Sequence, residues 1–253
     1  MTALRTLTAS LLLSAVAVPA MSATVVGLSG ENELHWIDTG SWTRTGGVSV
    51  TGVTGRLLGI DVRPAGGQLY GVFADGTLAR IDPQSGQATK VSMLATKLAD
   101  GVQATVDFNP VADKLRVMGS DGTSLRVTVE TGEVVTDGSH SYADATTPNV
   151  IAGAYTNSYK GTEKTQLFNI DGAAGWLVLQ DPPNDGKLNP VGGIGSMPKE
   201  AAFDIASDGQ GGNEAWLVVE GRFHSVNLET GATTEAARIE GANLRDIAIL
   251  PAM

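Results

Sequence analysis

Carboxylates recur at nearly regular intervals in short apolar segments of β-type sequence. Aspartate stands at four of the five corresponding places and tyrosine at the fifth, at Asp61, Asp107, Tyr155, Asp204 and Asp246. The successive spacings are 46, 48, 49 and 42 residues. Carboxylates that converge can hold a hard cation such as calcium through oxygen ligands. A pair of them can also act as acid and base, as in glycoside hydrolysis.

A second polar position follows two residues after three of these places. It holds Arg63, Asn109 and Asn157. Residues i and i+2 of a β-strand share one face, so this position extends the same polar surface. The predicted binding site consists of all eight residues, namely Asp61, Arg63, Asp107, Asn109, Tyr155, Asn157, Asp204 and Asp246.

The elements that must position these side chains are short strands in a repeated order. Residues 57–92 contain four β-rich runs, separated by a Pro-Ala-Gly-Gly turn, by Asp75-Gly76, and by a turn with Pro83 and Gly86. Asp-Gly between alternating apolar runs is a strong hairpin signal, because both turn positions tolerate positive φ. The same order returns in residues 104–136, 150–193 and 201–239.

The two ends of the chain complete one further unit. Residues 24–50 supply strands two to four, and residues 244–251 supply a first strand. Four-stranded units of about 46 residues are typical of propeller blades. We therefore predict an all-β, five-bladed β-propeller with antiparallel blades, in which the N- and C-terminal strands close one blade. The alternative is an open stack resembling a β-sandwich.

Glycines and tryptophans have predicted structural roles in this repeat. The third-to-fourth turns align on four glycines that should adopt positive φ, at Gly86, Gly132, Gly186 and Gly231. Trp36, Trp176 and Trp216 should fill the layers between blades. The loop Asn157–Thr165 is interpreted as a solvated loop, with partner binding as the alternative. Asp208–Glu214 offers oxygen ligands but lacks the order of an EF-hand, so it is interpreted as a loop.

The repetition of aspartate favours a structural interpretation of the axial set. First strands line the axis of a propeller, and a buried carboxylate needs hydrogen-bond donors. Backbone N–H groups of the adjacent blade would supply them and would tie blades together. A bound calcium ion and catalysis remain the alternatives, and we assign no catalytic residue.

The N-terminus has the layout of a secretory signal peptide. Arg5 precedes an apolar run from Leu7 to Ala20, and small residues follow as far as Ala23. We predict that residues 1–23 are a signal peptide and that residues 24–253 form one propeller domain. Export would place the protein in the periplasm or outside a bacterial cell. A retained membrane anchor is the alternative.

Composition excludes several kinds of site and partner. The chain has no cysteine, which excludes thiol catalysis and cysteine metal ligands. Its net charge of −10 argues against nucleic acid and anionic membranes as partners. The three histidines, His35, His140 and His224, lack the spacing of a zinc site.

Several segments resemble the bacterial domain-of-unknown-function 4394 family. They are "GIDVRPAGGQLYG", "VDFNPVADKLRVM", "GAYTN" and "DPPNDGKLNPVG", in the order that the family has them. Lys114 stands where arginine is usual, and "KGTEKT" is a short insertion. The resemblance implies a secreted, repeat-rich protein and assigns no reaction.

The near-regular repeat favours a non-catalytic exported module for binding or scaffolding over an enzyme. Its partner would be a protein or a carbohydrate, and the module would be a monomer without a cofactor. The second hypothesis is a secreted hydrolase of a sugar or a lactone that uses the axial carboxylates, with or without calcium.

Overall fold

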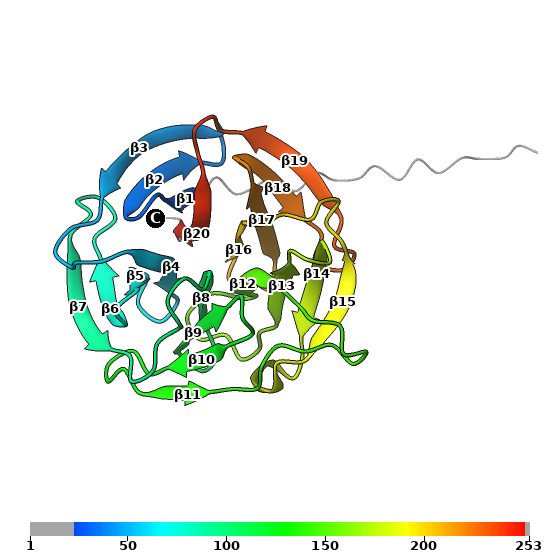
Figure 1. The fold of residues 1–253 in the computed structure, drawn as a ribbon. Helices are drawn as coiled ribbons and strands as arrows, with labels where there is room; N and C mark the ends of the chain where they lie inside the picture. The colour runs from blue at the N-terminus through cyan, green and yellow to red at the C-terminus, as the bar shows by residue number, and fades with distance from the viewer. Residues whose placement is uncertain (1–22, 251–253) are drawn as a thin grey trace, which may run out of the picture.

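The protein is a ring of five sheets around a common axis (Figure 1). The computed structural model describes residues 23–250, so nearly all of the predicted signal peptide lies outside the described residues. Each sheet has four antiparallel strands. The prediction of a five-bladed β-propeller is confirmed, and the open stack is excluded.

The strands occupy four concentric positions in the ring. The innermost are β20 (Leu244–Leu250), β4 (Leu57–Arg63), β8 (Ala104–Asn109), β12 (Val150–Tyr155) and β16 (Ala202–Ser207). Next come β1 (Thr24–Ser29), β5 (Gln68–Phe73), β9 (Lys114–Gly119), β13 (Leu167–Asp171) and β17 (Asn213–Val219). The third are β2 (Glu33–Asp38), β6 (Thr77–Ile81), β10 (Ser124–Val127), β14 (Trp176–Gln180) and β18 (Arg222–Val226). The outermost are β3 (Thr43–Ser49), β7 (Ala88–Met93), β11 (Val134–Thr136), β15 (Leu188–Gly193) and β19 (Thr233–Arg238).

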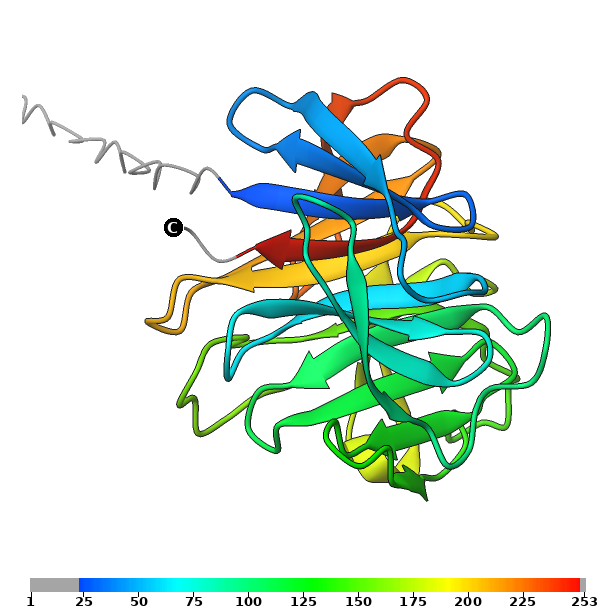
Figure 2. The ribbon, with the colours of Figure 1, turned by 90° about the vertical axis from the view of Figure 1, so that its left-hand side faces the viewer.

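The C-terminal strand closes the ring, as predicted. β20 pairs antiparallel with β1 and forms the inner strand of the blade that β1, β2 and β3 complete, which we call blade 1. Blades 2 to 5 then follow in chain order. Neighbouring innermost strands contact one another around the whole ring, including β16 with β20 and β20 with β4. Figure 2 shows that the start of β1 and the end of β20 lie at the same end of the axis.

The four aligned turn glycines have positive φ, as predicted. Their φ angles lie between 66° and 74°. The structure adds a second reason for glycine, which is the close approach of the preceding blade. A Cβ atom on Gly86 would lie 2.3 Å from the carbonyl oxygen of Ser49, and one on Gly231 would lie 2.5 Å from that of Gly192. These turns therefore contact the backbone that leaves the preceding blade.

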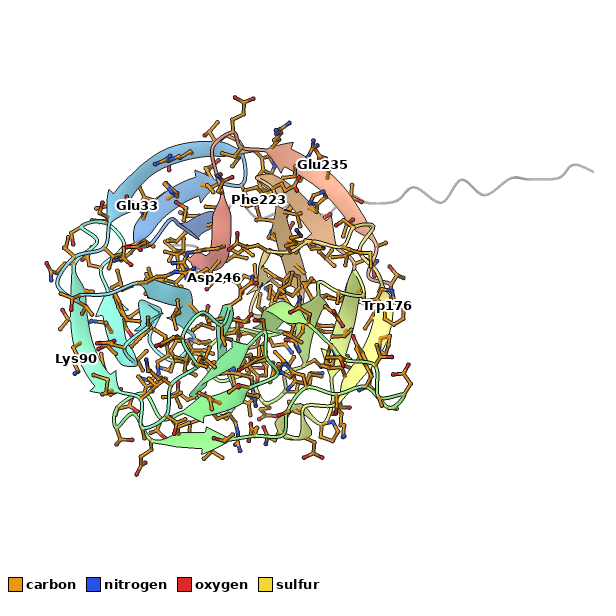
Figure 3. The ribbon with its side chains drawn as sticks, in the orientation of Figure 1. Glu33, Lys90, Trp176, Phe223, Glu235 and Asp246 are labelled. Carbon is orange, nitrogen blue, oxygen red and sulfur yellow. The ribbon has the colours of Figure 1, made fainter. Side chains whose placement is uncertain are left out.

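Apolar layers fill four of the five interfaces between blades. Trp36 and Trp216 pack in such layers, as predicted. The prediction for Trp176 is wrong, because its side chain is 41% exposed and lies at the outer rim in Figure 3. Its strand β14 pairs with the outermost strand β15, where Trp176 faces Gly193. Trp42 instead joins a core layer and contacts Trp216 edge to face at 4.8 Å.

Helical structure is minimal in the described part of the chain. It consists of the 3₁₀ turn Pro183–Asp185 between β14 and β15. Within residues 23–250, no helix has the length and apolar character needed to cross a membrane.

Candidate functional site

Four aspartates on the innermost strands bond to the backbone of the next blade. Asp246 accepts the N–H of Ile60 at 2.8 Å, and Asp61 accepts that of Phe108 at 2.6 Å. Asp107 accepts the N–H of Tyr155 at 3.0 Å, and Asp204 accepts that of Ile249 at 2.7 Å. Figure 3 shows Asp246 at the centre of the ring. The interblade hydrogen bonds that the repeat led us to expect are therefore present.

The interblade register corrects the alignment at Tyr155. Asp61 bonds to the residue that follows Asp107, and Asp107 bonds to the residue that follows Ala154. Ala154, not Tyr155, therefore occupies the place of Asp107 in β12. A shift by one residue turns a side chain to the other face of a strand. The Tyr155 side chain accordingly leaves the axis, and its hydroxyl accepts the Nε–H of Arg116 at 2.7 Å.

Asp246 lies on the axis but at a different level from the other aspartates. Asp204 bonds to the residue after Ala248, so Ala248 is the residue of β20 at the level of Asp204. Asp246 precedes it by two residues, which keeps the face and moves the carboxylate by roughly 7 Å along the strand. It instead approaches Gly59, where a Cβ atom would lie 2.7 Å from its Oδ2.

The remaining three aspartates form a tight buried group. One carboxylate oxygen from each of Asp61, Asp107 and Asp204 lies within 4.8 Å of the others. Burial raises the pKa of Asp204 to about 6, against the effect of the N–H groups of Ile249 and Ile205. Burial and then the charge of Asp204 raise the pKa of Asp61 well above its usual range. Burial, Asp61 and Asp204 do the same for the pKa of Asp107. The group therefore retains protons at a pH where ordinary carboxyls are ionised.

Arg63 and Asn109, two residues of the second polar position, have structural roles, the first between blades and the second within a turn. Arg63 binds both carboxylate oxygens of Asp113, at 2.8 and 2.6 Å, and also contacts Glu130 at 2.7 Å. These bonds clamp blade 2 to blade 3. Asn109 Oδ1 accepts the N–H groups of Val111 and Ala112 and so shapes the turn after β8.

Asn157 joins blades 4 and 5, where the axial aspartate is missing. Its backbone N–H donates to Asn213 Oδ1 at 2.7 Å, and Asn213 Nδ2 donates back to Asn157 Oδ1 at 3.0 Å. Asn157 has φ of 56°, a left-handed conformation that asparagine tolerates better than most residues. The reciprocal pair supplies the polar contact that Ala154 cannot make.

A cavity of about 650 Å³ opens at the end of the axis where β4, β16 and β20 finish. Asp61 and Asp204 line it, whereas the other six predicted residues, Arg63, Asp107, Asn109, Tyr155, Asn157 and Asp246, do not. Its walls also come from Ser158–Lys160 after β12 and from the hairpin that joins β16 to β17. The structure therefore brings two of the eight predicted residues into one open site.

The loops Asn157–Thr165 and Asp208–Glu214 contribute much of the cavity wall. Tyr159 and Lys160 come from the first loop, and Asp208 and Glu214 come from the second. Burial raises the pKa of Glu214. The sequence signal for Tyr159 and Lys160 is the extra length of the loop between β12 and β13, residues 156–166, because the equivalent loops of blades 2 and 3 have four residues each.

The interface between blades 3 and 4 is polar, which the sequence analysis missed. Its apolar contacts are confined to two small clusters, one of Met118, Tyr155 and Leu167 and one of Tyr142, Val150, Val178 and Leu188. Arg116, 1% exposed, fills the space and donates to Tyr155, Ser124, Asp137 and Asn184 at 2.7 to 3.0 Å. A signal for this was present in the sequence. Arg116 pairs with Asp107 across two strands, whereas the residues that pair with Asp61 and Asp204 are the aromatic Tyr70 and Trp216.

The three histidines lie apart from the cavity lining. His140 is buried, and burial with the nearby Arg116 lowers its pKa to about 4. Both of its ring nitrogens are without a hydrogen-bond partner among the described residues. His35 Nε2 contacts the Ser29 hydroxyl at 2.6 Å. His35 and His224 lie at equivalent positions of the third strands, β2 and β18, in adjacent blades.

The site can do two kinds of chemistry. The carboxylates of Asp61 and Asp204 offer acceptor lone pairs to a ligand in the cavity. Their raised pKa values also allow one carboxyl to hold a proton while the other is ionised. The Asp61, Asp107 and Asp204 oxygens together offer ligand atoms for a hard cation.

The chain belongs to the family described as Domain of unknown function (DUF4394), which matches residues 20–248. No curated protein matches it. Among solved structures, a structural genomics protein of unknown function from Bacteroides thetaiotaomicron VPI-5482 is 16% identical with a TM-score of 0.52. The match covers 84% of this chain and 55% of that one, so this chain spans about half of that protein.

A protein of unknown function from Bacteroides caccae is 15% identical with a TM-score of 0.47, over 87% of this chain and 74% of that one. At these identities the likeness concerns the fold alone. Family membership confirms the resemblance read from the sequence motifs, and it brings no reaction or ligand with it.

Proposed function

We propose that this family member is an exported, non-catalytic propeller that binds a small ligand in the axial cavity. The observation that carries the proposal is the cavity of about 650 Å³ at the end of the axis, within the size range of small-molecule sites. The buried Asp61 and Asp204 line its inner part, and part of its wall comes from the loops that follow β12 and β16. Rigid blades would hold such a site open without a ligand.

The hydrogen bonds of the axial aspartates support binding over catalysis. Both oxygens of Asp61 accept backbone N–H groups, from Val62 and Phe108. Both oxygens of Asp204 do so as well, from Ile205 and Ile249. Carboxylates held in this way keep the blades in register, and movement of one during a reaction would break an interblade bond.

A screen for thermal stabilisation by small molecules tests the binding proposal. A ligand that binds the folded state raises the melting temperature. Ala206 lines the cavity two residues after Asp204 on the same strand, so Ala206→Phe should fill the cavity and remove the stabilisation. Ala206→Ser is the matched control and should retain it. Equal stabilisation of both variants would place the ligand elsewhere and contradict the proposal.

A secreted hydrolase is the second candidate function. The observation in its favour is that Asp61 and Asp204 share the cavity, with candidate ligand oxygens within 4.8 Å of one another. Retaining glycosidases place two carboxyl groups about 5 Å apart. Turnover of chromogenic glycosides or lactones, with calcium or with a chelator, is the test. Activity that Asp204→Asn abolishes would replace the binding proposal.

The export component of the proposal has its own test. Expression of the whole chain in a Gram-negative bacterium should yield a processed protein in the periplasm or the medium. Intact mass should place the new N-terminus at Thr24. Cleavage after Ala20 would instead retain Ala23, whose backbone N–H donates to Thr39 Oγ1 at 2.9 Å. An unprocessed cytoplasmic chain would contradict export.

The monomeric state is also part of the proposal. Each blade completes its four-stranded sheet within one chain and β20 closes the ring, so the fold needs no strand from a second copy. Light scattering on the purified protein should give the mass of one chain. A stable dimer would contradict this component and would leave the cavity proposal to its own test.

A further inference from the structure

We propose that the ligand of the axial cavity is an organic cation, a protonated amine or guanidinium carried on an apolar body. The inference rests on the proposed function, because it names the ligand class for the same cavity. The lining has three properties that suit such a ligand, namely hydrogen-bond acceptors, carboxyl groups and apolar side chains.

The inner part of the cavity, lined by the buried Asp61 and Asp204, offers hydrogen-bond acceptors to a ligand. The backbone N–H groups nearest to it already donate to these two carboxylates. The N–H groups of Val62 and Ile205 donate to the carboxylates of their own neighbours, Asp61 and Asp204. The N–H of Ile249 donates to Asp204 as well. A ligand group that reaches this part therefore meets carboxylate lone pairs. Ammonium and guanidinium groups, which carry donors and no acceptor, complement such a surface.

The charge of the lining favours a cation. Four carboxylates line the cavity, Asp61, Asp204, Asp208 and Glu214, and they come from two blades. One basic side chain, Lys160, lines it, and that residue is exposed. Asp107 does not line the cavity, but one of its carboxylate oxygens lies within 4.8 Å of a carboxylate oxygen of Asp61. A cation among these groups would stabilise their ionised forms, which burial disfavours in the unliganded protein.

The apolar residues of the lining are suited to the apolar body of the ligand. Pro64, Ile249 and Leu250 line the cavity on the sides of blades 2 and 1. Tyr159, half-buried, lines it on the side of blade 4, where an aromatic face can contact an apolar group or a cation. A single metal ion would occupy a small part of about 650 Å³, so the volume favours an organic ligand.

The test is calorimetric titration of the processed protein with three probes of matched shape. They are 2-phenylethylamine, 2-phenylethanol and 3-phenylpropanoate, which are cationic, neutral and anionic at neutral pH. The amine should bind at least ~10-fold more tightly than the alcohol, as a charge-assisted contact would give. The carboxylate should not bind. Calcium chloride and cellobiose, titrated in parallel, represent a metal ion and a neutral sugar.

A double variant tests whether the carboxylates carry the preference. Asp208→Asn with Glu214→Gln removes two wall charges and leaves the axial aspartates intact. Asp208 Oδ1 accepts the N–H groups of Gln210 and Gly212, and asparagine keeps that oxygen. The amine should bind ~3- to 10-fold more weakly, and the alcohol should be unaffected. Asp185→Asn, an exposed change outside the cavity lining, is the matched control.

The outcomes separate this inference from the proposed function. Tighter binding of the alcohol, the anion, cellobiose or calcium than of the amine, abolished by Ala206→Phe, overturns the ligand class and leaves the cavity as the binding site. Amine binding that Ala206→Phe does not reduce contradicts both proposals. Binding of none of the probes overturns the ligand class and leaves the cavity proposal to the thermal screen.

Discussion

The carboxylate of Asp204 accepts the backbone N–H of Ile249 at 2.7 Å, and this bond ties the last blade to the strand that closes the ring. Three further aspartates make the equivalent contact at other interfaces. Between blades 4 and 5 the reciprocal pair of Asn157 and Asn213 takes their place. Each of the five interfaces therefore has a polar contact between inner segments of adjacent blades.

Loss of the asparagine pair should weaken the ring where the aspartate is missing. Asn213→Ala removes both hydrogen bonds to Asn157 and leaves a partly buried N–H without its partner. The free energy of unfolding should fall by about 1–3 kcal/mol. Urea unfolding measures it, with Asn189→Ala as control, because the exposed Asn189 side chain donates two hydrogen bonds within blade 4 and, among the described residues, none to another blade. A change no larger than that of the control would show that the pair is dispensable.

The buried aspartates should make the protein less stable as pH rises. Their folded pKa values lie above the unfolded value, so the folded state binds more protons between these values. The free energy of unfolding therefore falls as pH rises through that range. Asp204, raised from 3.8 to about 6, accounts for about 3 kcal/mol. Urea unfolding at pH 4 and pH 8 spans most of this range and measures the effect.

Asp107→Asn isolates this contribution. Asparagine retains an oxygen for the N–H of Tyr155 and removes one charge beside Asp61 and Asp204. The variant should match the wild type near pH 4 and be more stable at pH 8, by at least about 1 kcal/mol. His140, whose lowered pKa acts in the opposite direction, is present in both proteins and cancels. A variant less stable than the wild type at pH 8 would contradict the account.

The polar interface between blades 3 and 4 should depend on Arg116. Arg116→Met removes four hydrogen bonds and leaves Asp137, itself 4% exposed, with Arg126 as its remaining partner. Breaking a buried ion pair costs about 3–5 kcal/mol. Arg222→Met breaks the exposed pair with Glu235 and should cost less than about 1 kcal/mol. Equal losses in urea unfolding would show that the buried network adds nothing.

The contact between Gly59 and Asp246 should tolerate no side chain. A Cβ atom at Gly59 would lie 2.7 Å from Asp246 Oδ2 and 2.6 Å from a methyl group of Val106. Gly59→Ala should therefore destabilise the protein by about 1–3 kcal/mol. Gly193→Ala, with its nearest neighbour 4.0 Å away on an outermost strand, should be neutral or stabilising. Melting temperatures of the two variants measure the difference. An equal change in both would contradict the claim that the contact between Gly59 and Asp246 excludes a side chain.

The sequence predicted the blade number and the ring closure because both depend on repeated local signals. Alternating apolar residues and Asp-Gly or Gly turns mark each strand, and the C-terminal segment has the one pattern missing from the N-terminus. The positive φ of Gly86 and its equivalents follows from the same turn chemistry.

The sequence could not predict features that depend on how adjacent blades face one another. A register difference of one residue moved Tyr155 off the axis, and one of two residues moved Asp246 to another level. Spacings of 48 and 42 residues contain loops of unequal length, so they do not determine that register. The cavity was missed for the same reason, since its loops come from blades 4 and 5 and meet only in the closed ring.

The most direct test of the central claim is a titration of isotope-labelled protein with 2-phenylethylamine, followed by amide chemical shifts. The account predicts shift changes at Val62, Ile205 and Glu214, which line the cavity, and none at Ala79 or Val127, which lie in apolar layers. Changes confined to the outer strands, or no changes at saturating amine, would contradict the claim that the axial cavity binds an organic cation.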